Sequence, residues 1–197
     1  MDKTDEFKKS DYVIIRNLID ANEASNLYDY TLKNIKNGNL KDDQVPQTPS
    51  FYQDKKMVVL HKKLLPQVEY LLKKTLLPTF CYYRTYRTGA ILRAHKDRKA
   101  CEISISLNLG QQGDLWDLWL LDHNENAINI TLAPGDALLY RGCKLTHWRG
   151  KLVNADFVSQ VFFFFIDPKG WGRLWVTTEL IKKFFKRCRS LFGVVSY

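Results

Sequence analysis

Cysteine is scarce in this 197-residue sequence, and long apolar runs are absent. The four cysteines, Cys81, Cys101, Cys143 and Cys188, have no Cys-x-x-Cys spacing, which argues against a zinc site or a redox pair. Each lies among apolar residues, where a free cysteine behaves as a small hydrophobic side chain. No stretch approaches the roughly 18 apolar residues of a membrane-spanning helix, and the N-terminus MDKTDEFKKSDY lacks the apolar segment of a secretory signal. We therefore expect a cytoplasmic protein without a transmembrane segment.

Internal repeats and low-complexity segments are also missing. A chain of this length with 45% hydrophobic and 26% charged residues is expected to fold as a single domain spanning residues 1–197. Its formal net charge of +9 would attract a nucleic acid, an anionic membrane surface or an acidic substrate. Much of that charge lies in lysine pairs, which commonly serve solubility, so the charge alone does not select a partner.

The first 78 residues have mainly helical patterns and are expected to form an N-terminal support. Residues 12–20 predict a strand that ends at Asp20, a suitable N-cap for a helix over residues 21–35. Residues 36–50 are polar and predict a surface loop of the kind that flanks an active site. The periodicity of residues 64–76 predicts a second helix, which Pro78 is expected to end.

Residues 79–167 have a different texture, with about eight short runs rich in β-branched and aromatic residues, separated by Gly, Pro, Asn or Asp. This pattern is typical of a sandwich, barrel or jelly roll. A closing helix is expected within residues 168–197, where residues 177–192 place apolar side chains on one side and basic side chains largely on the other. Packing against the sheet is the interpretation we favour, with a membrane surface or a partner as the alternative.

The stretch RAHKDRKACEISISLNL, residues 93–109, places a histidine and an aspartate one residue apart at the start of an alternating run. On a strand, His95 and Asp97 would project from the same face, as a surface charge pair or as two ligands of one metal ion. His147, in GCKLTHWRG, is the best candidate for a third ligand, because His61 and His123 lack an acidic residue at a suitable offset. Two histidines and one carboxylate form the facial triad of non-haem iron(II) oxygenases.

These motifs carry a family resemblance. RTYRTGAILRAHKD, residues 84–97, matches an aromatic-x-x-Gly lead into His-x-Asp, and LAPGDALLYRGCKLTHW, residues 132–148, contains the distal histidine. The stretch from Tyr83 to Asp167 resembles the iron(II)- and 2-oxoglutarate-dependent dioxygenases, specifically their prolyl-hydroxylase-like branch. The resemblance implies a double-stranded β-helix, or jelly roll, mostly β with flanking helices, and an iron(II) ion held by His95, Asp97 and His147.

The same resemblance implies a reaction. 2-Oxoglutarate would be the co-substrate and dioxygen the oxidant, and a C–H bond of a protein or peptide side chain would be hydroxylated while 2-oxoglutarate is converted to succinate and CO2. A small-molecule substrate is the other partner that this reaction allows. Two alternatives stay open: oxidative demethylation of a nucleic acid, and a non-catalytic metal-binding jelly roll that acts as a binding module.

One departure from the family pattern concerns the 2-oxoglutarate site. Family members usually hold the far carboxylate with a basic residue on the strand after the distal histidine, where this chain has Phe157, Val158 and Ser159. A buried dicarboxylate needs a cation, preferably a guanidinium. Arg149 is our first candidate, since it could share a face with His147. Arg98 and Arg84 are weaker candidates, and Tyr86 resembles the tyrosine that hydrogen-bonds the same carboxylate.

Substrate-binding residues are expected near the mouth of the site. Arg93 precedes His95 by two positions, so it should share the inward face, and its charge would suit an acidic substrate. Trp148 is the second candidate, and together with Trp116 and Trp119 it could line a groove for an extended substrate.

Overall fold

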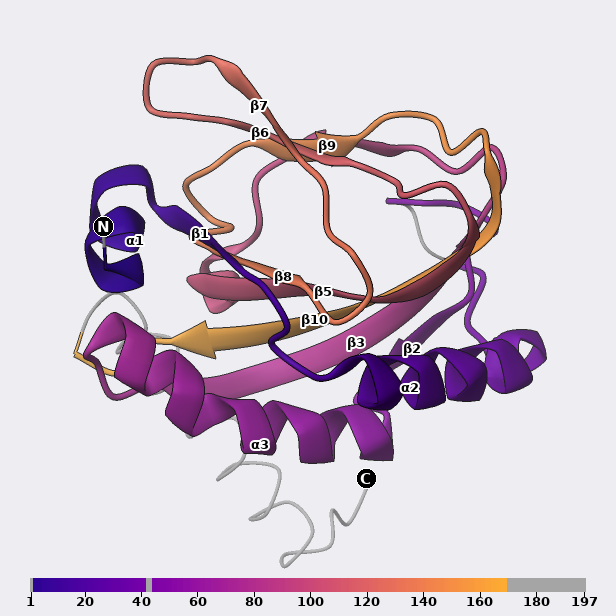
Figure 1. Ribbon diagram of the computed structural model, residues 1–197, viewed down its shortest axis with the longest axis horizontal. Helices are drawn as coiled ribbons and strands as arrows, with labels where there is room; N and C mark the ends of the chain where they lie inside the picture. Colours follow the sequence, from indigo (N-terminus) through magenta and orange to yellow (C-terminus); the bar gives the residue numbers. More distant parts are fainter. Residues whose placement is uncertain (1, 42–43, 170–197) are drawn as a thin grey trace, which may run out of the picture.

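Two antiparallel sheets face each other, and helices cover the outer face of the larger sheet (Figure 1). A computed structural model of the chain describes residues 2–41 and 44–169. The helix expected over residues 177–192 lies outside this range. Within it the helices are α1 (Lys3–Ser10), α2 (Ala21–Asn34) and α3 (Lys55–Leu72), with 3-10 turns at Ile35–Asn37 and Lys99–Cys101. The strands are β1 (Tyr12–Ile15), β2 (Ser50–Tyr52), β3 (Leu77–Arg87), β4 (Leu92–His95), β5 (Ile103–Gly113), β6 (Leu118–Leu121), β7 (Ala127–Ile130), β8 (Ala137–Tyr140), β9 (His147–Arg149) and β10 (Ala155–Ile166).

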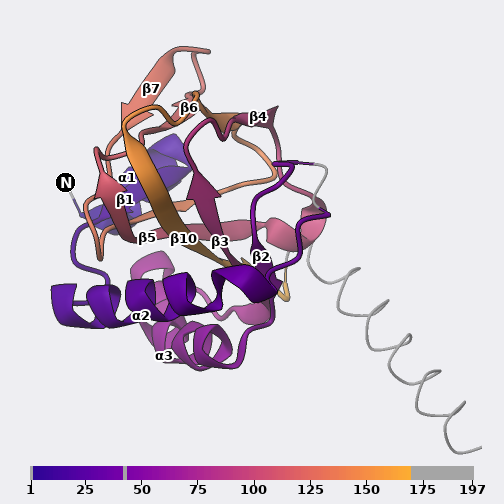
Figure 2. The same cartoon turned by 90° about the vertical axis from the view of Figure 1, so that its right-hand side faces the viewer.

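The major sheet has the order β1-β8-β5-β10-β3-β2, and the minor sheet has the order β4-β9-β6-β7. Figure 2 shows the minor sheet on one side of the major sheet and helices α2 and α3 on the other. This arrangement confirms the predicted mostly-β jelly roll with N-terminal helices. The N-terminal region also supplies both edge strands of the major sheet, because β1 pairs with β8 and β2 pairs with β3.

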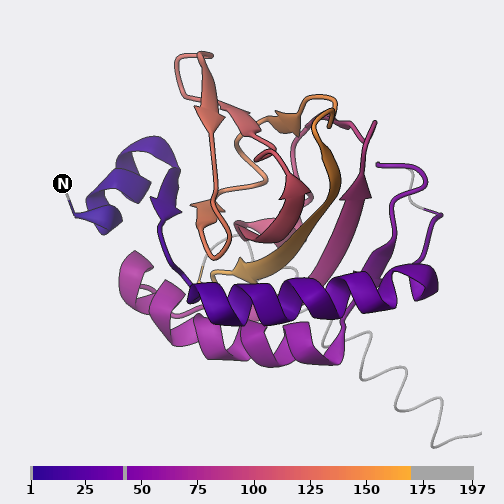
Figure 3. The same cartoon turned by 45° about the vertical axis from the view of Figure 1, so that its right-hand side comes forward.

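Strand alternation divides the major sheet into two chemically different faces. One set of alternate residues, including Cys81 on β3, Ile105 on β5 and Phe163 on β10, packs against Leu60 and Leu64 of α3 in one buried core. Figure 3 shows α2 and α3 along this face. The other set faces the minor sheet, where buried polar residues such as Ser106, Asn108 and Gln160 lie among apolar side chains.

The predicted start of α2 is confirmed, whereas the predicted end of the second helix is not. Asp20 caps α2, since its side chain accepts a hydrogen bond from the Glu23 amide at 2.8 Å. The prediction that Pro78 ends the second helix is wrong. Helix α3 continues through Pro66 and ends at Leu72, where Lys73 adopts a left-handed conformation with φ 52°. Because this residue reverses the chain, Pro78 already lies in β3.

In the described part of the chain, no helix combines the length and the apolarity needed to cross a membrane.

Candidate metal centre

The two histidines of the candidate site lie directly opposite each other on neighbouring strands. His95 ends β4 and pairs in register with His147 at the start of β9, and their ring centroids are 4.3 Å apart. Asp97 lies beyond the end of β4, where its amide donates to the Gly142 carbonyl at 2.9 Å. Its Oδ1 is 3.7 Å from His95 Nε2 and 3.8 Å from His147 Nε2. One ligand atom from each of the three residues falls within 4.8 Å of the others, a spacing that suits a single metal ion.

Backbone carbonyls orient both imidazoles. His95 Nδ1 is 2.8 Å from the Arg93 carbonyl, and His147 Nδ1 is 3.0 Å from the Leu145 carbonyl. Since a carbonyl can only accept a hydrogen bond, each Nδ1 carries the proton and each Nε2 presents its lone pair to the centre. Burial lowers the pKa of His147, although the Asp97 carboxylate opposes this effect, so the neutral ring that a metal requires is favoured.

Asp97 depends on two residues that the sequence did not single out. Ser104 Oγ donates to Asp97 Oδ2 at 3.0 Å, so Oδ1 is the oxygen directed at the histidines. Gly142 makes room for the carboxylate, because a Cβ at this position would lie 1.9 Å from Asp97 Oδ2 and 2.6 Å from Ser104 Oγ. The glycine of the YRG motif before His147 is therefore part of the site.

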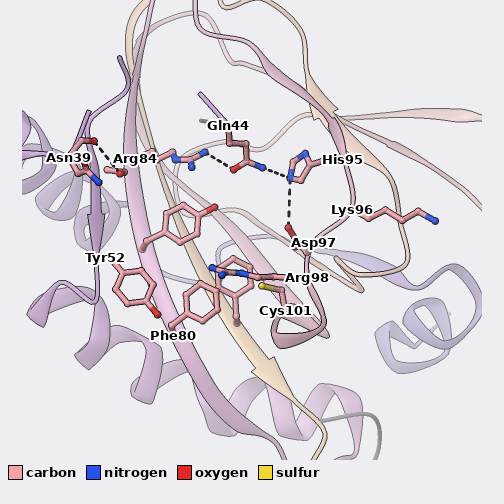
Figure 4. Close-up of a pocket in the computed structure, with 13 residues that line it drawn as sticks. Asn39, Gln44, Tyr52, Phe80, Arg84, His95, Lys96, Asp97, Arg98 and Cys101 are labelled. Carbon is pink, nitrogen blue, oxygen red and sulfur yellow. Dashed lines mark hydrogen bonds and ion pairs between the residues drawn. The ribbon is translucent and has the colours of Figure 1, made fainter. Parts of the chain in front are cut away.

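Gln44 also contacts the site, from the loop that precedes β2. Its Nε2 lies 2.7 Å from His95 Nε2, and its Oε1 accepts a hydrogen bond from Arg84 Nη1 at 3.0 Å (Figure 4). Because His95 Nε2 bears a lone pair, the Gln44 amide is the donor in this contact. Sequence reasoning missed Gln44, since nothing in the loop indicates that it reaches a histidine 51 positions away.

Arg149 lies behind the histidines in the interior between the two sheets. Its side chain faces inward two positions after His147, as predicted, and the residue is only 1% exposed. The guanidinium donates to the Trp116 carbonyl and, at 3.4 Å, to Gln160 Oε1. Among the described residues no carboxylate forms an ion pair with Arg149. Burial lowers the pKa of this arginine to about 10.

Two buried polar atoms in this part of the interior lack a hydrogen-bond partner among the described residues. They are Arg149 Nε and the Tyr86 hydroxyl. On β10, the buried Val158 packs with Tyr86, whereas the Ser159 hydroxyl bonds Thr31 and Thr85 toward the helices. A carboxylate here would compensate a buried cation and an unsatisfied hydroxyl, which is the environment that the far end of 2-oxoglutarate requires.

The other predicted site residues lie elsewhere. Arg98 is exposed, and its guanidinium lies over the Phe80 ring at 5.1 Å, at the mouth of the site rather than beside Tyr86. Arg93 is exposed and does not share the inward face with His95, contrary to prediction. A register shift between Leu92 and His95 breaks the alternation, so that Leu92 is the buried member of β4.

Trp148 also lies away from the metal ligands. It sits between His147 and Arg149 on β9 and therefore projects from the opposite face of the minor sheet. There it stacks on Trp119, with ring centroids 6.2 Å apart and an interplanar angle of 15°. Trp116 alone of the three tryptophans contacts the interior residues, through an edge contact with Tyr86 at 4.8 Å.

A cavity of about 510 Å³ opens in front of His95 and Asp97 (Figure 4). Its remaining lining residues are Asn39, Gln44, Ser50, Tyr52, Phe80, Tyr82, Arg84, Lys96, Arg98, Cys101 and Phe164. A second, inner cavity of only about 10 Å³ adjoins all three metal-ligand candidates, Tyr86 and Ser106. Gln44 and Arg84 line both cavities. A molecule of the size of 2-oxoglutarate therefore enters the inner space only if lining side chains move.

Solved structures with the same fold are numerous. A prolyl-4-hydroxylase from Pseudomonas putida aligns with a TM-score of 0.65 and 13% identity, over 82% of this chain and 96% of that one. A Trichoplax adhaerens prolyl hydroxylase, solved with a peptide fragment of a hypoxia inducible factor, aligns with a TM-score of 0.68 and 14% identity, over 85% of this chain and 89% of that one. The chain has the fold of the 2-oxoglutarate- and iron(II)-dependent oxygenases.

A third solved structure with this fold contains a metal ion and 2-oxoglutarate. HygX from Streptomyces hygroscopicus, solved with nickel and 2-oxoglutarate bound, aligns with a TM-score of 0.68 and 12% identity, over 85% of this chain and 87% of that one. By sequence, no protein-family profile and no curated protein matches the chain. The likeness to the oxygenases is therefore one of fold, and the chemistry has to be argued from this chain's own side chains.

Proposed function

We propose that the protein is an iron(II)- and 2-oxoglutarate-dependent dioxygenase that hydroxylates a C–H bond of a protein or peptide side chain. The observation that carries the proposal is the convergence of His95, Asp97 and His147 in front of a buried Arg149 that has no carboxylate partner among the described residues. Nitrogen and carboxylate ligands in this ratio suit iron(II) and leave open positions on the metal. When bound, iron and 2-oxoglutarate would supply the oxidation, with one oxygen atom of dioxygen inserted into the C–H bond and the other into succinate as CO2 is lost.

The residues of this chain would hold and orient these groups. The Arg93 and Leu145 carbonyls fix the two imidazoles, and Ser104 fixes Asp97. Arg149 and the Tyr86 hydroxyl would bind the far carboxylate of 2-oxoglutarate. A peptide target is supported by the T. adhaerens structure of the same fold, which was solved with a peptide fragment.

The first test is the formation of succinate from 2-oxoglutarate in the presence of iron(II) and air, without added substrate. Slow, iron-dependent succinate release is expected from the wild type and not from His147→Ala. Absence of succinate, together with absence of 2-oxoglutarate binding, would favour a non-catalytic binding module instead.

The second test concerns Arg149. Arg149→Met should weaken 2-oxoglutarate binding by roughly 100-fold, because charge-assisted bonds to the carboxylate are lost. The free energy of unfolding should fall little, since the variant also removes a buried cation that has no carboxylate partner. Arg98→Met is the matched control, and it should leave the affinity unchanged within about twofold because Arg98 is exposed in the outer cavity, where its guanidinium lies over the Phe80 ring. Equal affinities of wild type and Arg149→Met would show that another residue binds the carboxylate.

A further inference from the structure

An aromatic wall runs through the outer cavity from its rim toward the metal ligands. It consists of Tyr52 on β2, Phe80 and Tyr82 on β3, and Phe164 on β10. Successive ring centroids are 5.4 Å apart from Tyr52 to Phe80, 4.6 Å from Phe80 to Phe164 and 5.7 Å from Phe164 to Tyr82. Tyr52 is 65% exposed at the outer end, whereas Tyr82 also lines the inner cavity beside the ligands. This wall suits ring-bearing groups that approach the metal from the surface.

The charged groups around the same cavity are mostly cationic. Among the described residues that line it, Asp97 is the one acid, and that carboxylate is directed at the histidines. Arg84, Lys96 and Arg98 supply three cations. Arg84 is engaged with Gln44. In the described part of the chain, Arg98 has no carboxylate partner.

Arg98 and Lys96 differ in where they point. In Figure 4 the Arg98 side chain extends across the cavity toward Phe80, whereas the Lys96 ammonium extends away from the other labelled residues. The Arg98 guanidinium lies 5.1 Å from the centre of the Phe80 ring and contacts the Cys101 thiol, and the residue is exposed, so an anion can approach it from the cavity. A guanidinium without a carboxylate partner, held beside an aromatic wall, is suited to bidentate binding of a carboxylate.

We propose that the substrate is an acidic peptide segment in which Arg98 binds a Glu or Asp carboxylate and a neighbouring ring-bearing residue packs on the aromatic wall. This proposal rests on the proposed function and adds the substrate class. It also gives the net charge of +9 a role, because an acidic peptide is attracted to a basic protein from a distance.

The test uses the full chain and three labelled, capped peptides. The first contains two Glu-Pro steps separated by alanine, and in the other two Gln or Lys replaces each Glu. Fluorescence anisotropy should show that the Glu peptide binds about 10-fold more tightly than the Gln peptide, with the Lys peptide weakest. Arg98→Gln should bring the Glu and Gln peptides to nearly equal affinity.

Lys96→Gln is the matched control, because it removes the same charge one residue from Asp97. The preference for Glu should persist within about twofold in this variant, since the Lys96 ammonium extends away from Arg98 and the aromatic wall (Figure 4). Equal losses in the two variants would show that only the overall charge matters. Tyr52→Leu, at an exposed position, should weaken the Glu and Gln peptides about equally through loss of the ring contact.

Two results would overturn the proposal. One is equal binding of the Glu and Gln peptides to the wild type. The other is Arg98-dependent binding of a labelled oligothymidylate with no binding of the Glu peptide, which would assign the cavity to a nucleic acid. The iron(II) and 2-oxoglutarate complex is measured separately by its visible absorption. A complex that forms without any Glu preference contradicts the acidic-peptide proposal alone, whereas a wild type that forms no such complex contradicts the proposed function.

Discussion

At the scale of single residues, the candidate centre depends on side chains that prepare its ligands. The spacing of His95 and Asp97 and the family resemblance identified the three candidate ligands from the sequence. Ser104, Gly142 and Gln44 were not found in this way, because their contacts depend on how the chain folds around Asp97 and His95: Ser104 lies only seven positions from Asp97, whereas Gln44 lies 51 positions from His95. The identities of the three ligand candidates therefore predicted a metal site, whereas the contacts that hold these ligands in place depend on the folded structure.

Gly142 is predicted to be essential for the position of Asp97. Gly142→Ala places a methyl group 1.9 Å from Asp97 Oδ2, so the carboxylate has to move. We expect the affinity for Co(II), measured by calorimetry, to fall at least about 10-fold. Gly150→Ala is the control, because a Cβ there meets nothing within 4 Å. An unchanged Co(II) affinity in Gly142→Ala would argue that Asp97 is not a ligand.

Gln44 is predicted to compete with the metal. Its amide donates to His95 Nε2, the atom whose lone pair the metal needs. Gln44→Ala removes one hydrogen bond that must break on metal binding, so Co(II) affinity should rise by about 3- to 10-fold. Gln47→Asn, an exposed change in the same loop, should have no effect. Weaker metal binding by Gln44→Ala would instead indicate that Gln44 supports the bound metal.

At the scale of secondary structure, local irregularities decide which side chains face the site. Simple alternation predicted that Arg93, His95 and Asp97 share one face of a strand. The register shift in β4 turns Arg93 outward, and Asp97 lies in the following loop, where the amide contact with Gly142 positions it. Alternation held along β9, so the inward placement of Arg149 and the outward placement of Trp148 follow from the position of His147. A bulge depends on both paired strands and cannot be read from one of them.

The packing of α3 on the major sheet gives a prediction of pH dependence. His61 on α3 is 4% exposed and lies against Phe163 and Phe165 at ring distances of 5.2 and 4.6 Å. Burial lowers the pKa of His61 to about 4, whereas the unfolded chain has a pKa near 6.5. Between these values the unfolded state binds more protons, so this residue's contribution makes stability fall as the pH drops from about 6.5 to 4. The loss should be about 3 kcal/mol.

His61→Leu should remove this loss, which urea denaturation at pH 7 and pH 4.5 can measure. His123→Leu changes an exposed ring and should retain most of the wild-type loss. If His61→Leu and the wild type lose equal stability over this range, the buried ring is not the group responsible.

At the scale of the whole molecule, the two faces of the major sheet have different roles. One face packs on the helices, and the space between the sheets holds the metal-ligand candidates and Arg149 among two further apolar clusters. The order of short apolar runs predicted a sandwich, barrel or jelly roll with helices before it, and the family resemblance selected the jelly roll among them. The pattern of helices and strands could be predicted because apolar periodicity is a local property of the sequence. The positions of the Arg98, Arg149 and Gln44 side chains relative to the site depend instead on how the chain packs in three dimensions.

The most direct measurement for the central claim is the visible absorption of the full-length protein after anaerobic addition of iron(II) and 2-oxoglutarate. The wild type should develop a weak metal-to-ligand charge-transfer band, because the site holds both groups together. His95→Ala and His147→Ala should lack the band while retaining the circular dichroism of the wild type. A wild type without the band at saturating iron(II) and 2-oxoglutarate, or variants that keep it, would contradict the assignment of this centre.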